Sequence, residues 1–199
     1  GEGVRRVRAW PVTVKIDDRT AISVPAGLSA QEIFERAGLQ QGLREGTAAY
    51  APLAVLVNRE LAALAAPIDA DCTLSPVYPD APMGAEVYRH SLCFLLAKET
   101  REIVPKRRLL VSMAIGNGYY HYFDDNEPIS PSLLKALSSR MRSDVDADLP
   151  IQIVTYSWSD ALAYFEQSNQ ADTVALIEYI NDPFVQLNEC DGYRDVHIA

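Results

Sequence analysis

The stretch YRHSLCFLL at residues 88–96 decides the fold of the second half of the chain, because it forms the middle of one amphipathic helix. Apolar residues recur at helical spacing across residues 85–104, at Val87, Leu92, Leu95, Leu96 and Ile103. Pro105 ends the pattern, since proline lacks the backbone N–H that a continuing helix needs. The sequence therefore predicts a helix over residues 85–104.

Strands and helices alternate after this helix. Residues 109–115 and 119–123 favour two strands around a Gly116-Asn117-Gly118 turn, and Ser130-Pro131 begins another helix. The remaining predicted elements are a strand at 151–156, a helix at 158–167 and short strands at 184–187 and 193–197. Residues 171–180 are ambiguous between helix and strand. The second unit is thus predicted to be α+β.

The residues before the helix predict a smaller unit. Residues 10–16 and 21–24 read as a hairpin, and strands are expected at 53–57 and 72–78. Between the hairpin and the strand at 53–57, Ser29 and Glu32 form a capping box at the start of a short helix. A ββ-helix-ββ order predicts a β-grasp fold. The linker PDAPMG after Tyr78 then predicts a boundary between two domains, at residues 8–79 and 84–199.

The first unit resembles the TGS domain, a ubiquitin-like module of threonyl-tRNA synthetases, certain GTPases and stringent-response enzymes. The resemblance rests on VPAGLSAQEI at 24–33, AVLVNREL at 54–61 and IDAD at 68–71. Arg59 stands where the family commonly has glycine in a hairpin turn. A residue with a Cβ is tolerable there if its φ stays negative.

The second unit resembles the editing-type domain of threonyl- and alanyl-tRNA synthetases over nearly its whole length. The match covers AIGNGYYHYF at 114–123 and SDALAYF at 159–165. The family carries H-x-x-x-H on a helix and a later Y-x-D-x-C-R-G-P-H segment, which together bind a metal. Here His90 is the first ligand, Phe94 replaces the second histidine, and His197 replaces the cysteine. The last ligand would lie just past Ala199.

The chain departs from the editing-type pattern at Phe94 and His197. With these departures, and with IGNGYY at 115–120 and DVDADLP at 144–150, it resembles bacterial uridine-kinase-like proteins. In that group a TGS domain and an editing-like domain precede a P-loop nucleoside kinase. The resemblance implies that a kinase domain follows in cis and that ATP and Mg²⁺ belong to it alone. No glycine of this sequence is followed by lysine, so G-x-x-x-x-G-K-S/T does not occur in it.

Composition narrows the class of protein. The 199 residues are 48% hydrophobic and carry a net charge of −9, which disfavours broad, nonspecific nucleic-acid binding. No apolar run approaches the roughly 20 residues that span a bilayer, so no membrane partner is expected. The three cysteines are widely spaced, which favours reduced thiols and a cytoplasmic protein.

Two groups of residues are candidates for binding. The candidates for a ligand site are His90, Cys93, Tyr120, Arg194 and His197, of which His90 and His197 could hold zinc in a degenerate site. The candidates for RNA contact are Lys98, Arg101, Arg107 and Arg108. For each group a purely structural role is the alternative: hydrogen-bonded remnants, packed aromatics, or a solvated helix face.

The leading hypothesis is a non-catalytic regulatory region that recognises a nucleotide, RNA or tRNA and belongs to a uridine-kinase-like protein. It needs no cofactor in this chain. One alternative is a metal-dependent deacylase that edits aminoacyl-tRNA, in which a metal or its water attacks the ester. The other alternative is a stand-alone RNA-binding module.

Overall fold

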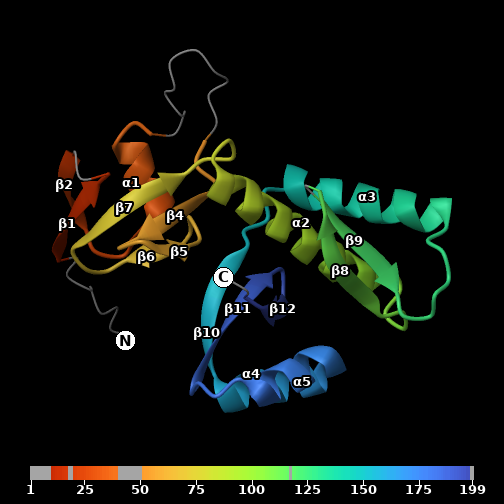
Figure 1. Cartoon of the computed structure of the whole chain (residues 1–199). Coiled ribbons are helices and arrows are strands. Elements are labelled where there is room, and N and C mark those ends of the chain that lie inside the picture. The colour runs from red at the N-terminus through yellow and green to blue at the C-terminus, as the bar shows by residue number, and fades with distance from the viewer. Residues whose placement is uncertain (1–9, 18–19, 40–50, 117, 198–199) are drawn as a thin grey trace, which may run out of the picture. The chain divides into compact units, whose positions relative to one another are not determined.

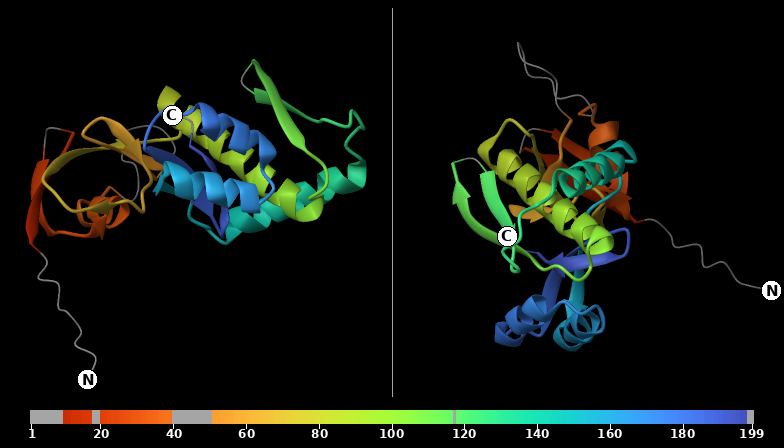
Figure 2. Two further views of the ribbon diagram at one scale, coloured as in Figure 1. Left: turned by 90° about the horizontal axis from the view of Figure 1, so that it is seen from below. Right: turned by 90° about the vertical axis from the view of Figure 1, so that its right-hand side faces the viewer.

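A computed structural model describes residues 10–17, 20–39, 51–116 and 118–197, without the side chains of residues 113–115. The chain is a mixed α+β protein with several small sheets (Figures 1 and 2). It divides into two compact units, one up to Glu86 and one from Val87 to His197. Residues 8–9, 18–19, 40–50 and 198–199 of the predicted domains lie outside the described residues, as does Asn117 of the predicted turn.

The first unit contains a five-stranded sheet. Its strands are β1 (Pro11–Ile16), β2 (Thr20–Pro25), β4 (Ala54–Val57), β5 (Glu60–Ala62) and β7 (Cys72–Val77). They lie in the order β2-β1-β7-β4-β5, with β1 and β7 parallel and the other neighbours antiparallel. Two short strands, β3 (Leu28–Ser29) and β6 (Pro67–Ile68), form a separate antiparallel pair.

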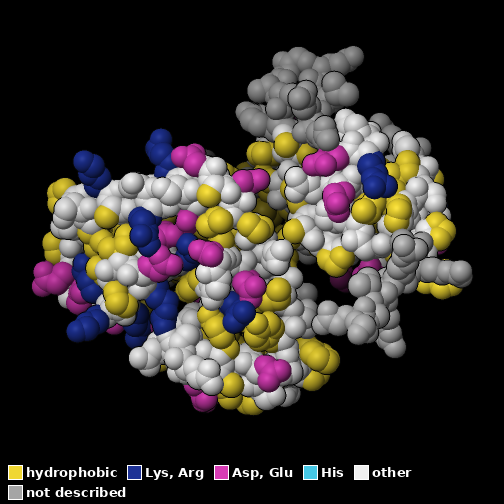
Figure 3. All heavy atoms as spheres, turned by 180° about the vertical axis from the view of Figure 1, so that it is seen from behind, with side chains coloured by type: hydrophobic (Ala, Val, Ile, Leu, Met, Phe, Trp, Pro, Cys, Tyr) yellow, Lys and Arg dark blue, Asp and Glu magenta, His cyan; other side chains and the backbone are white. Residues whose placement is uncertain are grey.

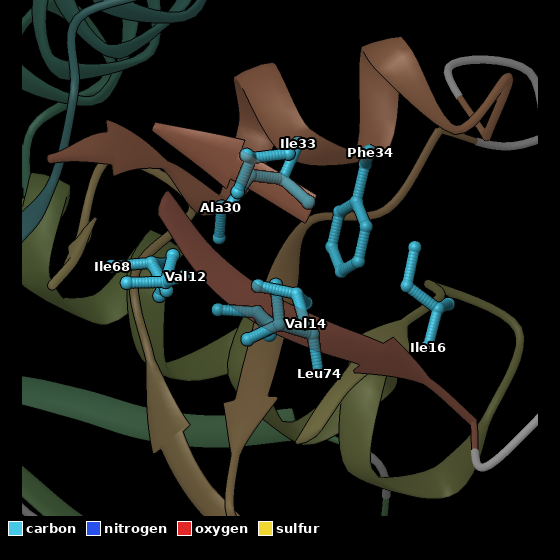
Figure 4. Close-up of a cluster of buried hydrophobic side chains, with 10 residues drawn as sticks. Val12, Val14, Ile16, Ala30, Ile33, Phe34, Ile68 and Leu74 are labelled. Carbon is cyan, nitrogen blue, oxygen red and sulfur yellow. The ribbon is translucent and has the colours of Figure 1, made fainter. Parts of the chain in front are cut away.

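The core of this unit lies between the sheet and α1 (Ala30–Arg36). Strand β1 alternates strictly, so that Val12, Val14 and Ile16 are buried and the residues between them are exposed. Figure 4 shows these side chains facing Ile33 and Phe34 of the helix. The predicted capping box is present: the Ser29 hydroxyl accepts from the N–H of Glu32, and the Glu32 carboxylate accepts from the N–H of Ser29.

The turn between β4 and β5 holds a residue with a Cβ, Arg59, at a positive φ. Both of its central residues have positive φ, +49° at Asn58 and +73° at Arg59, which is the pattern of a type I′ turn. Asn58 tolerates this conformation well, and its side-chain oxygen also accepts from the N–H of Thr73. Arg59 is therefore held in the left-handed region, so the condition of a negative φ is not met and the residue carries backbone strain.

An Arg59→Gly variant is expected to stabilise the first unit. Relief of the left-handed strain is worth about 1–2 kcal/mol, and the greater freedom of glycine in the unfolded chain takes back about 0.4–1 kcal/mol. The midpoint of urea unfolding should therefore rise. Arg59→Ala is the control, because it removes the same charge but keeps the Cβ. An equal gain in both variants would show that φ is not the cause.

The second unit begins with most of α2 (Pro82–Ile103), the long helix expected from its apolar spacing. Next come β8 (Leu109–Ile115) and β9 (Gly118–Phe123), an antiparallel hairpin whose register shifts between Val111 and Ala114. Helix α3 (Pro131–Asp146) follows, with the Ser130 hydroxyl accepting from the N–H of Leu133 at its start.

The rest of the second unit is a three-stranded sheet with two helices. Strands β10 (Gln152–Ser157), β11 (Phe184–Cys190) and β12 (Tyr193–Val196) are antiparallel in the order β10-β11-β12. Helices α4 (Trp158–Gln167) and α5 (Ala171–Tyr179) lie side by side next to it (Figure 1). Residues 171–179, ambiguous in the sequence, are helical because Ile177 is fully buried in a cluster with Phe165 and Leu187. Among the described residues, no helix is long and apolar enough to cross a lipid bilayer.

Candidate functional site

The two candidate metal ligands lie in the second unit, and each is held by a polar neighbour. Nε2 of His90, on α2, lies 3.1 Å from the hydroxyl of Tyr119 on β9. Nδ1 of His197, just after β12, lies 2.9 Å from the side-chain oxygen of Asn188 on β11. An amide oxygen only accepts, so Nδ1 of His197 donates and its Nε2 keeps a lone pair.

The pKa of His197 depends on the charge of His90. Burial lowers the pKa of His197, and the charge of His90 lowers that pKa further. The imidazoles of His90 and His197, the histidine pair, are therefore within electrostatic reach of each other. The fold thus brings together two residues that are more than a hundred positions apart in the sequence.

Phe94 occupies the place where the resemblance implies a second histidine. It is 7% exposed and lies on α2, one helical turn after His90. Its ring lies 5.2 Å from that of Tyr193, with the planes tilted by 50°. Leu95, Cys190 and Met141 belong to the same apolar cluster. Phe94 is therefore a packed core residue, one helical turn from His90.

The donors among the described residues do not by themselves complete a zinc site. Such a site needs three or four protein ligands, and no group of three His, Cys, Asp or Glu side chains converges among the described residues. Cys93 and Cys190 are free thiols whose pKa values are raised by burial. Burial favours the neutral thiol over the thiolate that a metal would bind.

The other candidates for the ligand site lie in different surroundings. Tyr120, on β9, is 55% exposed and its ring stacks on that of Tyr122. Arg194 is paired with Glu189, and its guanidinium lies over the rings of Tyr156 and Tyr164. These three contacts tie Arg194 to β10, β11 and α4.

The four candidates for RNA contact also differ. Lys98 is 2% exposed, and its ammonium contacts Glu99 at 2.7 Å and Asp144 at 3.3 Å, so it does not reach the surface. Arg107 pairs with Asp125 and covers the ring of Phe123 at 3.7 Å. Arg108 is about half exposed and pairs with Asp172 on α5. Arg101 is half-buried.

Asp195 was not among the predicted site residues, yet its surroundings are unusual. Burial raises the pKa of its carboxyl, which accepts from the hydroxyls of Thr173 and Tyr193. Tyr193, Asp195 and His197 are two residues apart, the spacing at which side chains share one face of a strand. This two-residue spacing is the signal by which the sequence could have pointed to Asp195. The sequence alone, however, does not tell which face of a short strand is buried.

Comparison with known proteins gives a distant relationship. No model of a known protein family matches the chain. Threonine–tRNA ligase of Desulfovibrio desulfuricans is 30% identical over 138 residues, which is 69% of this chain and 21% of the relative. The enzymes of Acetivibrio thermocellus and Acidithiobacillus ferrooxidans are 28% and 32% identical, over 83% and 80% of this chain and 25% of each relative.

The chain is therefore distantly homologous to the N-terminal region of threonyl-tRNA synthetases, over most of its own length. It spans only about a quarter of the length of these relatives. The relatives lend no support to the resemblance to uridine-kinase-like proteins, which stays a prediction.

Proposed function

We propose that this chain is a non-catalytic region that recognises tRNA, built on the scaffold of a TGS domain followed by an editing-type domain. The observation that carries the proposal is Phe94, buried against Tyr193 one helical turn from His90. A phenyl ring cannot coordinate a metal, and replacing it would open a gap in the apolar cluster. The scaffold has kept its packing at the position where the related sites have a ligand.

The first unit fits the proposal through its topology. A sheet in the order β2-β1-β7-β4-β5, with β1 and β7 parallel and one helix packed on it, is the arrangement expected of a β-grasp TGS domain. The sequence of the second unit follows the editing-type pattern in the same order along the chain. That the first unit is a TGS domain and the second an editing-type domain is itself part of the proposal.

Recognition of tRNA is favoured by charge as well as by homology. Residues 87–143, which carry most of α2, the hairpin and most of α3, contain nine Lys and Arg against five Asp and Glu, a net charge of +4 in a chain of −9. In Figure 3, several Lys and Arg side chains lie on the surface at the left of the view, with Asp and Glu side chains among them. Clustered positive charge is the main source of affinity for phosphate backbones. The relatives are named as ligases of tRNA.

Binding of fluorescently labelled tRNA, followed by anisotropy at several salt concentrations, tests the proposal. Affinity should fall linearly with salt on logarithmic axes, and Arg108→Ala should lower the slope by roughly 0.7–0.9, the contribution of one phosphate contact. Arg36→Ala, which removes an exposed charge from α1 of the first unit, is the matched control. Absence of binding at about 50 mM salt, where phosphate contacts are strong, would overturn the proposal.

The histidine pair favours a second function, metal-dependent deacylation of aminoacyl-tRNA. Both imidazoles are oriented by hydrogen bonds, and Nε2 of His197 keeps its lone pair. This function requires zinc bound in stoichiometric amount and ester hydrolysis that His90→Ala abolishes. Incubating the protein with zinc and aminoacyl-tRNA, and following release of the amino acid, decides between hydrolysis and recognition alone.

A place in a uridine-kinase-like protein remains the narrower form of the proposal. In that case the region would regulate a kinase domain that lies outside residues 1–199. Uridine phosphorylation by the longer protein, with and without tRNA, would test it, since a regulatory region should make the rate depend on tRNA.

A further inference from the structure

One face of the hairpin β8–β9 presents a pair of stacked aromatic rings to solvent. Tyr120 and Tyr122 on β9 are 55% and 37% exposed, their ring centroids lie 5.9 Å apart, and their planes differ by 25°. We call these two residues the tyrosine face. The alternate residues behave differently, because Tyr119 bonds to His90 and Phe123 is 1% exposed. The hairpin therefore buries one set of aromatic rings and exposes the other.

The tyrosine face continues across the hairpin to a basic side chain. Leu110 is the cross-strand partner of Tyr122, and the N–H of Asp124 bonds to the carbonyl of Arg108. With a period of two, Arg108, Leu110, Tyr120 and Tyr122 share one face of the two strands. The side chain of Arg108 is 54% exposed. Strands β8 and β9 contain no Asp or Glu, so the rings lie on uncharged strands. At the end of the hairpin, Arg108 lies beside Asp124, with 3.9 Å between its guanidinium and the carboxylate.

We infer that the tyrosine face stacks unpaired bases of RNA, with Arg108 close to a phosphate of the same strand. The inference rests on the proposed recognition of tRNA and adds the surface and the kind of RNA. Bases of any sequence offer a flat π surface to an aromatic ring, whereas a base inside a duplex is already stacked. The positive charge of residues 87–143 supplies long-range attraction, and the rings supply the preference for single strands.

The charge distribution argues for an anionic occupant such as RNA over a neutral or basic protein surface. The tyrosine face lies within the segment of net charge +4, while residues 144–197 hold eleven Asp and Glu against one Lys or Arg. Arg108 is already paired with Asp172, and a phosphate would compete for the same guanidinium. An exposed ion pair of this kind contributes little to stability, so the exchange costs little.

A single-stranded oligoribonucleotide containing 2-aminopurine tests the inference with the full chain. Fluorescence of 2-aminopurine falls when the base stacks, so binding should quench it. Tyr120→Ala/Tyr122→Ala should abolish the quenching and weaken binding of the single strand roughly five- to 150-fold for each stack lost. Binding of a fully paired duplex of the same sequence should change little.

Two variants control for the fold and for the chemistry. Tyr120→Phe/Tyr122→Phe keeps both rings and should bind like the natural chain. Tyr179→Ala removes a tyrosine that is 88% exposed on α5, outside the hairpin, and should leave quenching unchanged. Circular dichroism and the unfolding midpoint show whether the alanine variants remain folded.

The outcomes separate the two proposals. If the natural chain binds tRNA and the double alanine variant still quenches 2-aminopurine, the tyrosine face is not the stacking surface while recognition of tRNA stands. If the natural chain binds neither tRNA nor the single strand, both proposals fail. Concentration-dependent self-association that the alanine variant loses, without RNA binding, would assign the face to a second copy of the chain and overturn the inference.

Discussion

Replacing Phe94 with histidine is expected to give the second unit a zinc site. The new imidazole would lie one helical turn from His90, and residues four apart on a helix are neighbours on one face. His197, whose pKa feels the charge of His90, would supply the third ligand. Three protein ligands with an open fourth position form a complete catalytic-type zinc site. The variant should therefore retain about one zinc ion per chain through gel filtration, measured by elemental analysis.

The same substitution should destabilise the chain when zinc is absent. Loss of a buried phenyl ring costs about 3–5 kcal/mol when it is cut to alanine, and an imidazole without a partner in an apolar cluster recovers little of this. Zinc should then raise the unfolding midpoint, because it binds only the folded form. Phe94→Leu is the control: it keeps the site apolar and should neither bind zinc nor respond to it. A folded Phe94→His variant that binds no zinc would show that the three imidazoles do not converge.

Removing the charge of Lys98 is expected to destabilise the second unit by up to about 3–5 kcal/mol, the cost of breaking a buried ion pair, because Glu99 then keeps only Arg140 as a cationic partner. Lys98 and Glu99 are 2% and 1% exposed, and Asp144 of α3 completes the contact. Arg140 of α3 also bonds to Glu99 at 2.9 Å. Lys98→Met preserves the length of the side chain and removes only the charge. Urea unfolding measures the loss, and Lys106→Met, at an exposed position, should change the free energy of unfolding little.

This cluster also predicts how stability depends on pH. Burial opposes ionisation of Glu99, but hydrogen bonds with Asp144, Lys98 and Arg140 outweigh it and lower its pKa to about 2. Burial and the hydrogen bond with Glu99 raise the pKa of Asp144, which offsets part of the effect on stability. A lowered carboxyl pKa contributes stability that is fully present above the pKa of the unfolded chain. That contribution should be lost as the pH falls from about 4.5 to 2. In Lys98→Met the acid-induced loss should be smaller, and an unchanged pH profile would contradict the role assigned to the cluster.

The local structure of both units could be predicted from the sequence with few errors. Residues 158–167 were expected to be helical and are α4, and the Ser29–Glu32 capping box is present. These features depend on neighbours a few positions apart, whose spacing determines local geometry. The conformation of Arg59 is the exception, because two cross-strand pairs, Val57 with Glu60 and Leu56 with Leu61, impose a tight turn whatever residue occupies it.

The candidate site was predicted only in part. The sequence singled out His90 and His197, but it could not show that Asn188 and Tyr119 orient them, since these contacts join residues on different elements. Lys98 looked like a surface cation, because a lysine on an amphipathic helix is usually solvated. Its burial depends on Asp144 of α3, which lies 46 positions along the chain.

The sequence by itself determined the order of the longer elements, the resemblance of both units, and the phenylalanine at position 94 where that resemblance implies a histidine, because each is a matter of residue type and short-range spacing. Only the tertiary structure decided that Phe94 is packed against Tyr193, that Lys98 is internal, and that Tyr120 and Tyr122 face solvent. The physical reason is that alternation along a strand separates two sets of side chains, but what packs against each face is settled by distant segments.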